Sequence, residues 1–224
     1  MSREAETPLP PDRFEELLRA GSPVFSLSLS PSTFGRLARY LSELDRWRRH
    51  TNLTGQLSPN DLATHALESV FGESLIVHGE CVVDIGSGAG FPGLPLGIAR
   101  PDLDVTLVEP RQKRAAFLRH IARELELPSV AVVEDRIEKV GGQTFGVATT
   151  RAVGGFGSWI GDAQFLSSGG ALLAWTTQGA ALAEELGALF TPERALAIPG
   201  SAKREIAVFR KSPGHVPRGT PAGD

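Results

Sequence analysis

The chain has 224 residues, of which 41% are hydrophobic, and a formal net charge of -3 at pH 7. This length suffices for one domain with a sizeable core plus an extension, and the charge argues against a general nucleic-acid coating protein. The single cysteine, Cys81, excludes a disulfide framework within the chain and a multi-cysteine zinc site, so we expect no metal. Without an apolar run of about 18 residues or a signal-peptide pattern, the sequence predicts a cytoplasmic protein with no membrane partner.

Residues 1–78 are predicted to form a helical arm. Its helices are expected over residues 12–20, 31–50 and 58–77, and the second has one apolar stripe, formed by Phe34, Leu37, Leu41 and Leu44. Ser58 and Pro59 are typical of the N-cap and first turn of the third helix. Because such a stripe buries its side chains, we expect the arm to pack on the rest of the chain.

From Cys81 onward, strands alternate with helices. Strands are predicted over residues 81–85, 104–109, 130–134 and 145–150, with helices over residues 92–99 and 111–127. This alternation implies right-handed crossovers and a parallel sheet covered on both faces, which is an α/β, Rossmann-like fold.

The C-terminal part is less regular. Helices are predicted over residues 156–165 and 180–190, and strands over residues 171–176, 195–198 and 205–209. The last two strands are close in sequence, so we expect them to pair antiparallel. Residues 213–224 hold three prolines and three glycines, a composition that predicts a flexible tail.

The segment after the first predicted strand carries the strongest functional signal. Gly86, Gly88 and Gly90 can adopt positive φ, which lets a strand turn sharply into a helix whose free N–H groups face a ligand. Gly88-x-Gly90-x-x-Gly93 satisfies the dinucleotide fingerprint, and Asp84-x-Gly86-x-Gly88 resembles motif I of S-adenosylmethionine-dependent methyltransferases. The glycine pattern alone does not decide between a dinucleotide and S-adenosylmethionine.

Two further strand ends belong to the expected cofactor site. Glu109 follows the glycines by about twenty residues, where a carboxylate accepts both hydroxyls of a ribose; the alternative is an acid favoured by a helix dipole. The third strand ends at residues 134–138, where an adenine would lie against Ile137.

The remaining residues favour a methyltransferase. A dehydrogenase needs a histidine or a Tyr/Lys pair near the nicotinamide, whereas the single tyrosine, Tyr40, lies in the arm. Cytosine C5 methylation needs a thiolate, and Cys81 lies at the wrong end of its strand. In place of an Asp/Asn-Pro-Pro-aromatic turn, the fourth strand is followed by Arg151. Guanine N7 has an in-plane lone pair and requires alignment and water exclusion, without a general base.

Several segments between Trp47 and Arg210 occur together and in a particular order. Residues 47–54 read Trp-Arg-Arg-His-Thr-Asn-Leu-Thr, and residues 64–69 read Thr-His-Ala-Leu-Glu-Ser. They are followed by Asp84 to Gly93, Arg100-Pro101, Glu109, Lys113-Arg114, Phe117-Leu118, Arg136-x-Glu138 and Thr150-Arg151-Ala152. In this combination the chain resembles the bacterial small-subunit rRNA guanine-N7 methyltransferases, the RsmG or GidB family, with Glu68 in place of the family's aspartate.

The resemblance implies a class I methyltransferase core over residues 79–212, S-adenosylmethionine as cofactor, and methyl transfer to N7 of a guanosine in 16S rRNA. The implied partner is small-subunit rRNA or the ribosomal particle, and we expect a monomer. Arg151 is implied to position methyl and acceptor. The cofactor-binding residues expected from the motif and the resemblance are Asp84, Gly86, Gly88, Gly90, Phe91, Glu109, Ile137, Glu138 and Arg151.

RNA contacts are expected from Arg48, Arg49, Asn52 and His65. The alternatives are that the arginines stabilise a helix C-terminus, that Asn52 caps a turn, and that His65 is a partly buried core histidine. The basic residues after Glu109 form a second candidate RNA face or a solvated helix surface. Trp175 is expected to pack, with stacking on a guanine as the alternative.

Two departures from the family pattern concern the substrate. No lysine occurs in residues 174–179 after the fifth strand, where the family has Lys-Gly, and residues 217–221 form a shortened version of a Pro-Arg-x-x-Gly-x-Pro ending. Two rivals therefore stay open: a related methyltransferase acting on another RNA or a small molecule, and a non-catalytic RNA- or ribosome-binding module that retains the pocket. A nicotinamide oxidoreductase ranks last.

Overall fold

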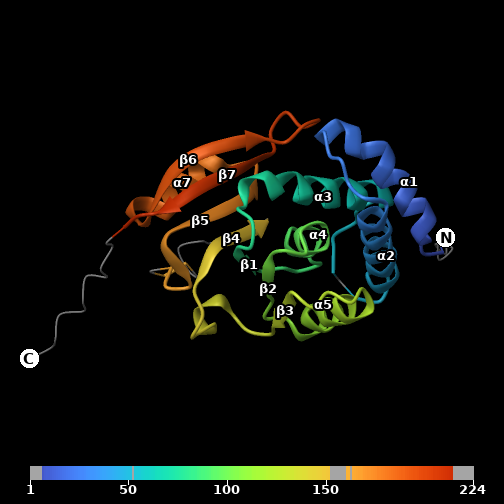
Figure 1. Ribbon diagram of the computed structural model, residues 1–224, viewed down its shortest axis with the longest axis horizontal. Coiled ribbons are helices and arrows are strands. Elements are labelled where there is room, and N and C mark those ends of the chain that lie inside the picture. The colour runs from blue at the N-terminus through green and yellow to red at the C-terminus, as the bar shows by residue number, and fades with distance from the viewer. Residues whose placement is uncertain (1–6, 52, 152–159, 162, 214–224) are drawn as a thin grey trace, which may run out of the picture.

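A computed structural model describes residues 7–51, 53–151, 160–161 and 163–213, which form a seven-stranded sheet flanked by helices (Figure 1). The strand order is β3-β2-β1-β4-β5-β7-β6. The pairs from β3 to β5 are parallel, whereas β7 pairs antiparallel with both β5 and β6. The strands are β1 (Cys81–Ile85), β2 (Asp104–Val108), β3 (Val130–Val133), β4 (Phe145–Arg151), β5 (Leu166–Thr176), β6 (Phe190–Ala197) and β7 (Glu205–Lys211). The predicted α/β sheet and its late antiparallel pair are confirmed.

Helices cover both faces of this sheet. One buried apolar cluster joins α1 (Pro11–Gly21), α2 (Pro31–Trp47), α3 (Pro59–Phe71), α4 (Gly93–Ala99) and α5 (Gln112–Glu124) to one face. The cluster on the other face includes α7 (Gly179–Leu186) and the 3-10 helices η3 (Ile137–Lys139) and η4 (Gly187–Leu189). Within the described residues, no helix is both long and apolar enough to cross a membrane.

The third predicted helix starts as expected and ends early. Ser58 accepts a hydrogen bond from the N–H of Asp61, and the Asp61 carboxylate accepts one from the N–H of Ser58, which completes a capping box. The helix ends at Phe71, and two 3-10 helices, η1 (Ser22–Phe25) and η2 (Gly72–Leu75), follow α1 and α3. A Cβ at Gly72 would lie 2.4 Å from Cζ2 of Trp175, so only glycine allows this close approach. The predicted continuation of the α-helix to residue 77 was wrong, because the chain changes to a 3-10 helix at Gly72 and leaves it after Leu75.

Other predicted boundaries also differ from the structure. β6 begins at Phe190, five residues before its predicted start, and α2 and α5 end at Trp47 and Glu124, three residues before their predicted ends. β5 begins five residues before the predicted position, because Leu166 already pairs with Phe145 of β4, and residues 167–170 form an irregular stretch before pairing resumes at Ala171. The helix predicted over residues 180–190 ends at Leu186, since Gly187 has a φ of 55° and β6 begins at Phe190. Residues 160–161 and 163–165 are not helical, and the rest of the helix predicted over residues 156–165 lies outside the described residues.

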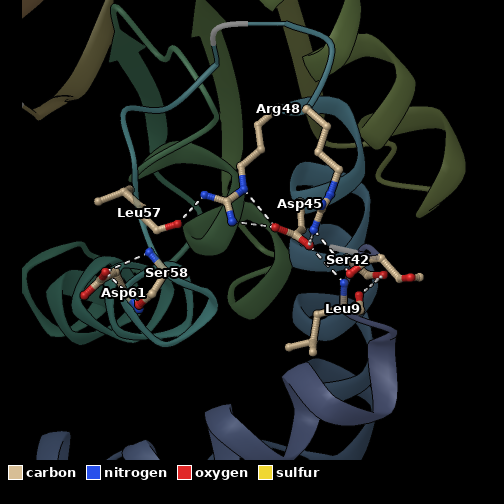
Figure 2. A network of polar contacts seen from close by, with 9 residues as sticks. Leu9, Ser42, Asp45, Arg48, Leu57, Ser58 and Asp61 are labelled. Carbon is tan, nitrogen blue, oxygen red and sulfur yellow. Dashed lines mark hydrogen bonds and ion pairs between the residues drawn. The ribbon is translucent and has the colours of Figure 1, made fainter. Parts of the chain in front are cut away.

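Asp45 connects the start of the described chain to α2 and to the segment before α3 (Figure 2). Its carboxylate accepts hydrogen bonds from the N–H of Leu9 at 2.9 Å and from Nε of Arg48 at 2.8 Å, and it pairs with Arg49 at 3.1 Å. Arg48 also donates to the carbonyl oxygen of Leu57. The carboxylate therefore joins the segment at Leu9 to the end of α2, and Arg48 extends this network to Leu57 before α3.

Asp45→Asn should lower the free energy of unfolding by roughly 2–3 kcal/mol at pH 7, because it removes the charge that two arginines share. Burial alone would raise the pKa of Asp45, but the Leu9 N–H and the two arginines outweigh it and lower the pKa. Its stabilisation is therefore present above the unfolded pKa of about 4 and is lost as the pH falls further. Urea denaturation at several pH values measures this, with exposed Asp104→Asn as the control. Equal losses in both variants, or a difference independent of pH, would contradict the assignment.

Candidate functional site

The glycine-rich turn follows β1 at the carboxyl edge of the parallel strands. Gly86, Gly88 and Gly90 have φ values of 70°, 57° and 110°, a region that favours glycine. The turn is tied to the neighbouring strand, because the N–H groups of Gly86 and Ser87 both donate to the carbonyl oxygen of Val108, at 2.9 Å and 3.1 Å. The predicted strand-to-helix turn is confirmed. The expectation of free N–H groups is wrong for its three glycines, because Gly86, Gly88 and Gly90 donate to Val108, Glu109 and Ser87 respectively.

Tyr40 supports this turn from the helical arm. Its hydroxyl donates to the carbonyl oxygen of Ala89 at 2.8 Å, and its ring meets that of Phe91 edge-on at 5.7 Å. Burial raises the pKa of Tyr40, which keeps the hydroxyl protonated as a donor. We expected only packing from the arm, although Tyr40 lies three and four residues from Leu37 and Leu44 and so shares their buried side.

Asp84 lies beneath the turn, fully buried. Oγ1 of Thr149, its register partner on β4, donates to Oδ1 of Asp84 at 2.9 Å. Burial raises the pKa of Asp84 to about 7. A Cβ at Gly93 would lie 2.7 Å from Cβ of Asp84, so the chain after the turn is packed directly against this residue. Asp84 therefore joins β1 to β4 through its carboxyl group and packs against the start of α4.

Glu109 joins the ends of β1 and β2. Its Oε2 accepts the N–H of Gly88 and its Oε1 accepts the N–H of Arg111, both at 2.9 Å. Each carboxylate oxygen has a further acceptor site, which suits the two hydroxyls of a ribose. Beyond β3, Ile137 is buried and Glu138 is exposed. This chemistry fits an adenosine placed across the strand ends.

Arg151 ends β4 and faces α3. Its Nη2 donates to Oε2 of Glu68 at 2.7 Å, and Nη1 of Arg204 lies 2.6 Å from Oε1 of the same carboxylate. Glu68 is 0% exposed. Burial, followed by the charges of Arg151 and Arg204, lowers the pKa of His65 to about 4, so its ring is neutral at pH 7.

A cavity of about 550 Å³ opens beside Arg151 at the ends of β4 and β5. His65, Thr177 and Arg204 are among its lining residues. Trp175 also borders it but is 4% exposed, and its indole N–H donates to the carbonyl oxygen of Glu68 at 2.8 Å. These contacts support packing over base stacking for Trp175.

The predicted RNA-binding residues do not gather in one place. Arg48 and Arg49 bind Asp45, His65 lines the cavity beside Arg151, and Asn52 lies outside the described residues. A second cavity of about 370 Å³ is lined by three basic residues that follow Glu109, namely Arg111, Lys113 and Arg114, together with Gln112 and with His50, Thr51 and Leu53 from the segment after α2. The structure thus separates a structural arginine pair from a basic surface next to the glycine-rich turn.

The family model described as GidB, rRNA small subunit methyltransferase G, matches residues 34–196. The chain belongs to this family. A relative named ribosomal RNA small subunit methyltransferase G from Xanthomonas oryzae pv. oryzae is 37% identical over 194 residues, covering 83% of this chain and 90% of that protein. One from Neisseria meningitidis serogroup C is 33% identical and covers 88% and 98%. The match to the Nitrosomonas europaea relative is 44% identical and spans about half of that protein, 49%.

Solved structures place this member of the methyltransferase G family in the class I methyltransferase fold. A ribosomal protein L11 methylase from Lactobacillus delbrueckii subsp. bulgaricus has a TM-score of 0.54 at 11% identity, covering 67% of this chain and 79% of that one. A precorrin-6y C5,15-methyltransferase from Geobacter metallireducens has a TM-score of 0.52 at 15% identity, covering 71% and 92%. At these identities the likeness concerns the fold alone. The family and the fold class inferred from the sequence are both confirmed.

Proposed function

We propose that the protein transfers the methyl group of S-adenosylmethionine to N7 of a guanosine in small-subunit, 16S, rRNA. The observation that carries the proposal is the Glu109 carboxylate bonded to the N–H of Gly88, with the Arg151 cavity at the neighbouring strand ends. It combines an acid suited to ribose hydroxyls, a turn of positive-φ glycines and a cavity large enough for an acceptor at one edge of the sheet. Family membership supports both the cofactor and the RNA substrate.

The cofactor would be held by groups from three strand ends. The backbone of Gly86, Gly88 and Gly90 would contact its methionine part, and Glu109 would accept the ribose hydroxyls. Ile137 and Glu138 would border the adenine, with Phe91 flanking the turn and Asp84 supporting it. The bound cofactor supplies an electrophilic methyl group on a sulfonium.

The acceptor base would occupy the cavity beside Arg151. Guanine N7 attacks with its own lone pair, so the chain's residues need only hold the base in line and exclude water. A neutral His65 agrees with this, since its pKa of about 4 makes it a poor base. The wall of the cavity carries charges of both signs, namely Arg151 and Arg204, which share the Glu68 carboxylate, and Glu185. With such a substrate, we propose that the protein acts in the bacterial cytoplasm and as a monomer.

The test is transfer of labelled methyl from S-adenosylmethionine to unmodified small-subunit rRNA, offered both naked and as the assembled particle. We expect incorporation that digests to N7-methylguanosine by nucleoside mass. Incorporation into a different acceptor, with rRNA inert, would replace this proposal with the rival substrate. Cofactor and RNA binding without turnover on any acceptor would indicate a non-catalytic module. Tight NAD binding without competition from S-adenosylmethionine would indicate an oxidoreductase.

A further inference from the structure

Glu68 is a buried carboxylate shared by two arginines from different parts of the chain. It lies on α3, Arg151 ends β4, and Arg204 immediately precedes β7. The distances are 2.7 Å from Nη2 of Arg151 to Oε2 and 2.6 Å from Nη1 of Arg204 to Oε1. One carboxylate therefore balances two guanidinium groups, and the cluster has a net charge of about +1.

Arg204 is itself fixed by the turn that precedes β7. Its Nε donates to Oγ of Ser201 at 3.3 Å, its N–H donates to the same atom at 3.0 Å, and its carbonyl oxygen accepts the N–H of Ile198 at 2.9 Å. Its side chain keeps 35% exposure, whereas that of Arg151 has 15%. The Arg204 side chain is thus anchored at the rim of the cavity, and the Arg151 side chain lies deeper, at the end of β4.

The deeper arginine depends on the outer one through the carboxylate. Thr150, the residue before Arg151, pairs with Ile85, the residue before the glycine-rich turn, so Arg151 lies between the turn and the acceptor cavity. Without Arg204, Oε1 of Glu68 would lose its ion-pair partner, and the Arg151 guanidinium could rotate to bind both oxygens. That rotation would move Arg151 away from its position beside the cofactor and acceptor.

We propose that Arg204 is a positioning residue that fixes Arg151 for methyl transfer by holding the shared carboxylate of Glu68. Arg204 also lines the same cavity as Thr177, in the segment where the family pattern has a lysine that this chain lacks, so it supplies positive charge there. The inference rests on the proposed function, because it assigns Arg151 a place beside the reacting atoms.

The experiment is a double-mutant cycle with Arg204→Gln, Arg151→Gln and the double variant in the full chain. We expect Arg204→Gln to lower kcat about tenfold with an unchanged KM for rRNA, and Arg151→Gln to lower kcat about a hundredfold. The double variant should be no slower than Arg151→Gln alone, because Arg204 acts through Arg151. Arg204→Lys should restore most of the rate. Lys203→Gln, an exposed charge change in the same turn, is the control and should leave kcat unchanged.

Three results would overturn this assignment. Additive losses in the double variant would show that Arg204 acts independently of Arg151. If Arg204→Gln raised the KM for rRNA and weakened the dependence of that KM on salt concentration, Arg204 would instead be a ligand of an RNA phosphate. A lower melting temperature with normal kcat per folded molecule would make its role structural only.

The assay of the wild-type chain distinguishes a failure of the proposed function from a failure of this inference. If the wild-type chain leaves rRNA unmodified, that function is wrong, and the same cycle is then measured as the Kd for S-adenosylmethionine by calorimetry. Non-additive losses in Kd would support the coupling of Arg204 to Arg151, and additive losses would refute it.

Discussion

Gly86→Val should abolish S-adenosylmethionine binding, with a loss of at least about a hundredfold in affinity, or ~2.7 kcal/mol. Gly86 has a φ of 70° and donates its N–H to Val108, so its backbone is held in a conformation that valine disfavours. The valine side chain would also occupy the surface on which the cofactor would rest. Isothermal titration calorimetry with the cofactor gives the affinity, and thermal unfolding gives the accompanying change in stability.

The matched control is Gly79→Val. Gly79 has nearly the same φ, 71°, but a Cβ there meets nothing within 4 Å, and the residue lies at the opposite end of β1. Both variants should therefore lose a similar amount of stability, about 1–2 kcal/mol, from the backbone strain. Only Gly86→Val should lose the cofactor. Unchanged affinity in Gly86→Val, or equal losses in both variants, would remove the turn from the cofactor site.

Glu68→Gln should lower the free energy of unfolding by about 3–5 kcal/mol and remove methyl transfer. The neutral amide leaves the Arg151 and Arg204 guanidinium groups without their shared counter-charge in a buried position. The expected loss is large because Glu68 is 0% exposed, so water does not replace it. Urea denaturation at pH 7 gives the stability, and the rRNA assay gives the turnover of the folded fraction.

The control for Glu68 is Glu193→Gln on β6. Glu193 pairs with Arg210 at 2.6 Å, the same separation as in the Arg204 pair, but both side chains are exposed. Its loss should stay below about 1 kcal/mol. A similarly small loss in Glu68→Gln would show that the buried cluster contributes little to stability.

Local features of the sequence predicted those elements that depend on local chemistry. Short apolar runs that alternate with helical patterns along the chain predicted β1 to β4. The glycines after Ile85 predicted the turn, because positive φ is a property of single residues. The same reasoning placed β5 too late, since residues 167–170 have low strand propensity and lie in the irregular stretch between the Phe145–Leu166 and Val147–Ala171 pairs. It also extended α3 past Phe71, where the chain continues from Gly72 as a 3-10 helix.

The sequence by itself determined the family, the parallel part of the sheet and the glycine-rich turn, because motif spacing and the alternation of strands and helices are properties of neighbouring residues. Only the tertiary structure decided which charges are available for function. Arg48 and Arg49 are engaged by Asp45, while Glu68 gathers Arg151 and Arg204. The Glu68–Arg151 bond joins residues 83 positions apart, and such a long-range pairing has no period in the sequence. It exists because α3, β4 and the β6–β7 turn pack around one buried carboxylate that needs a counter-charge.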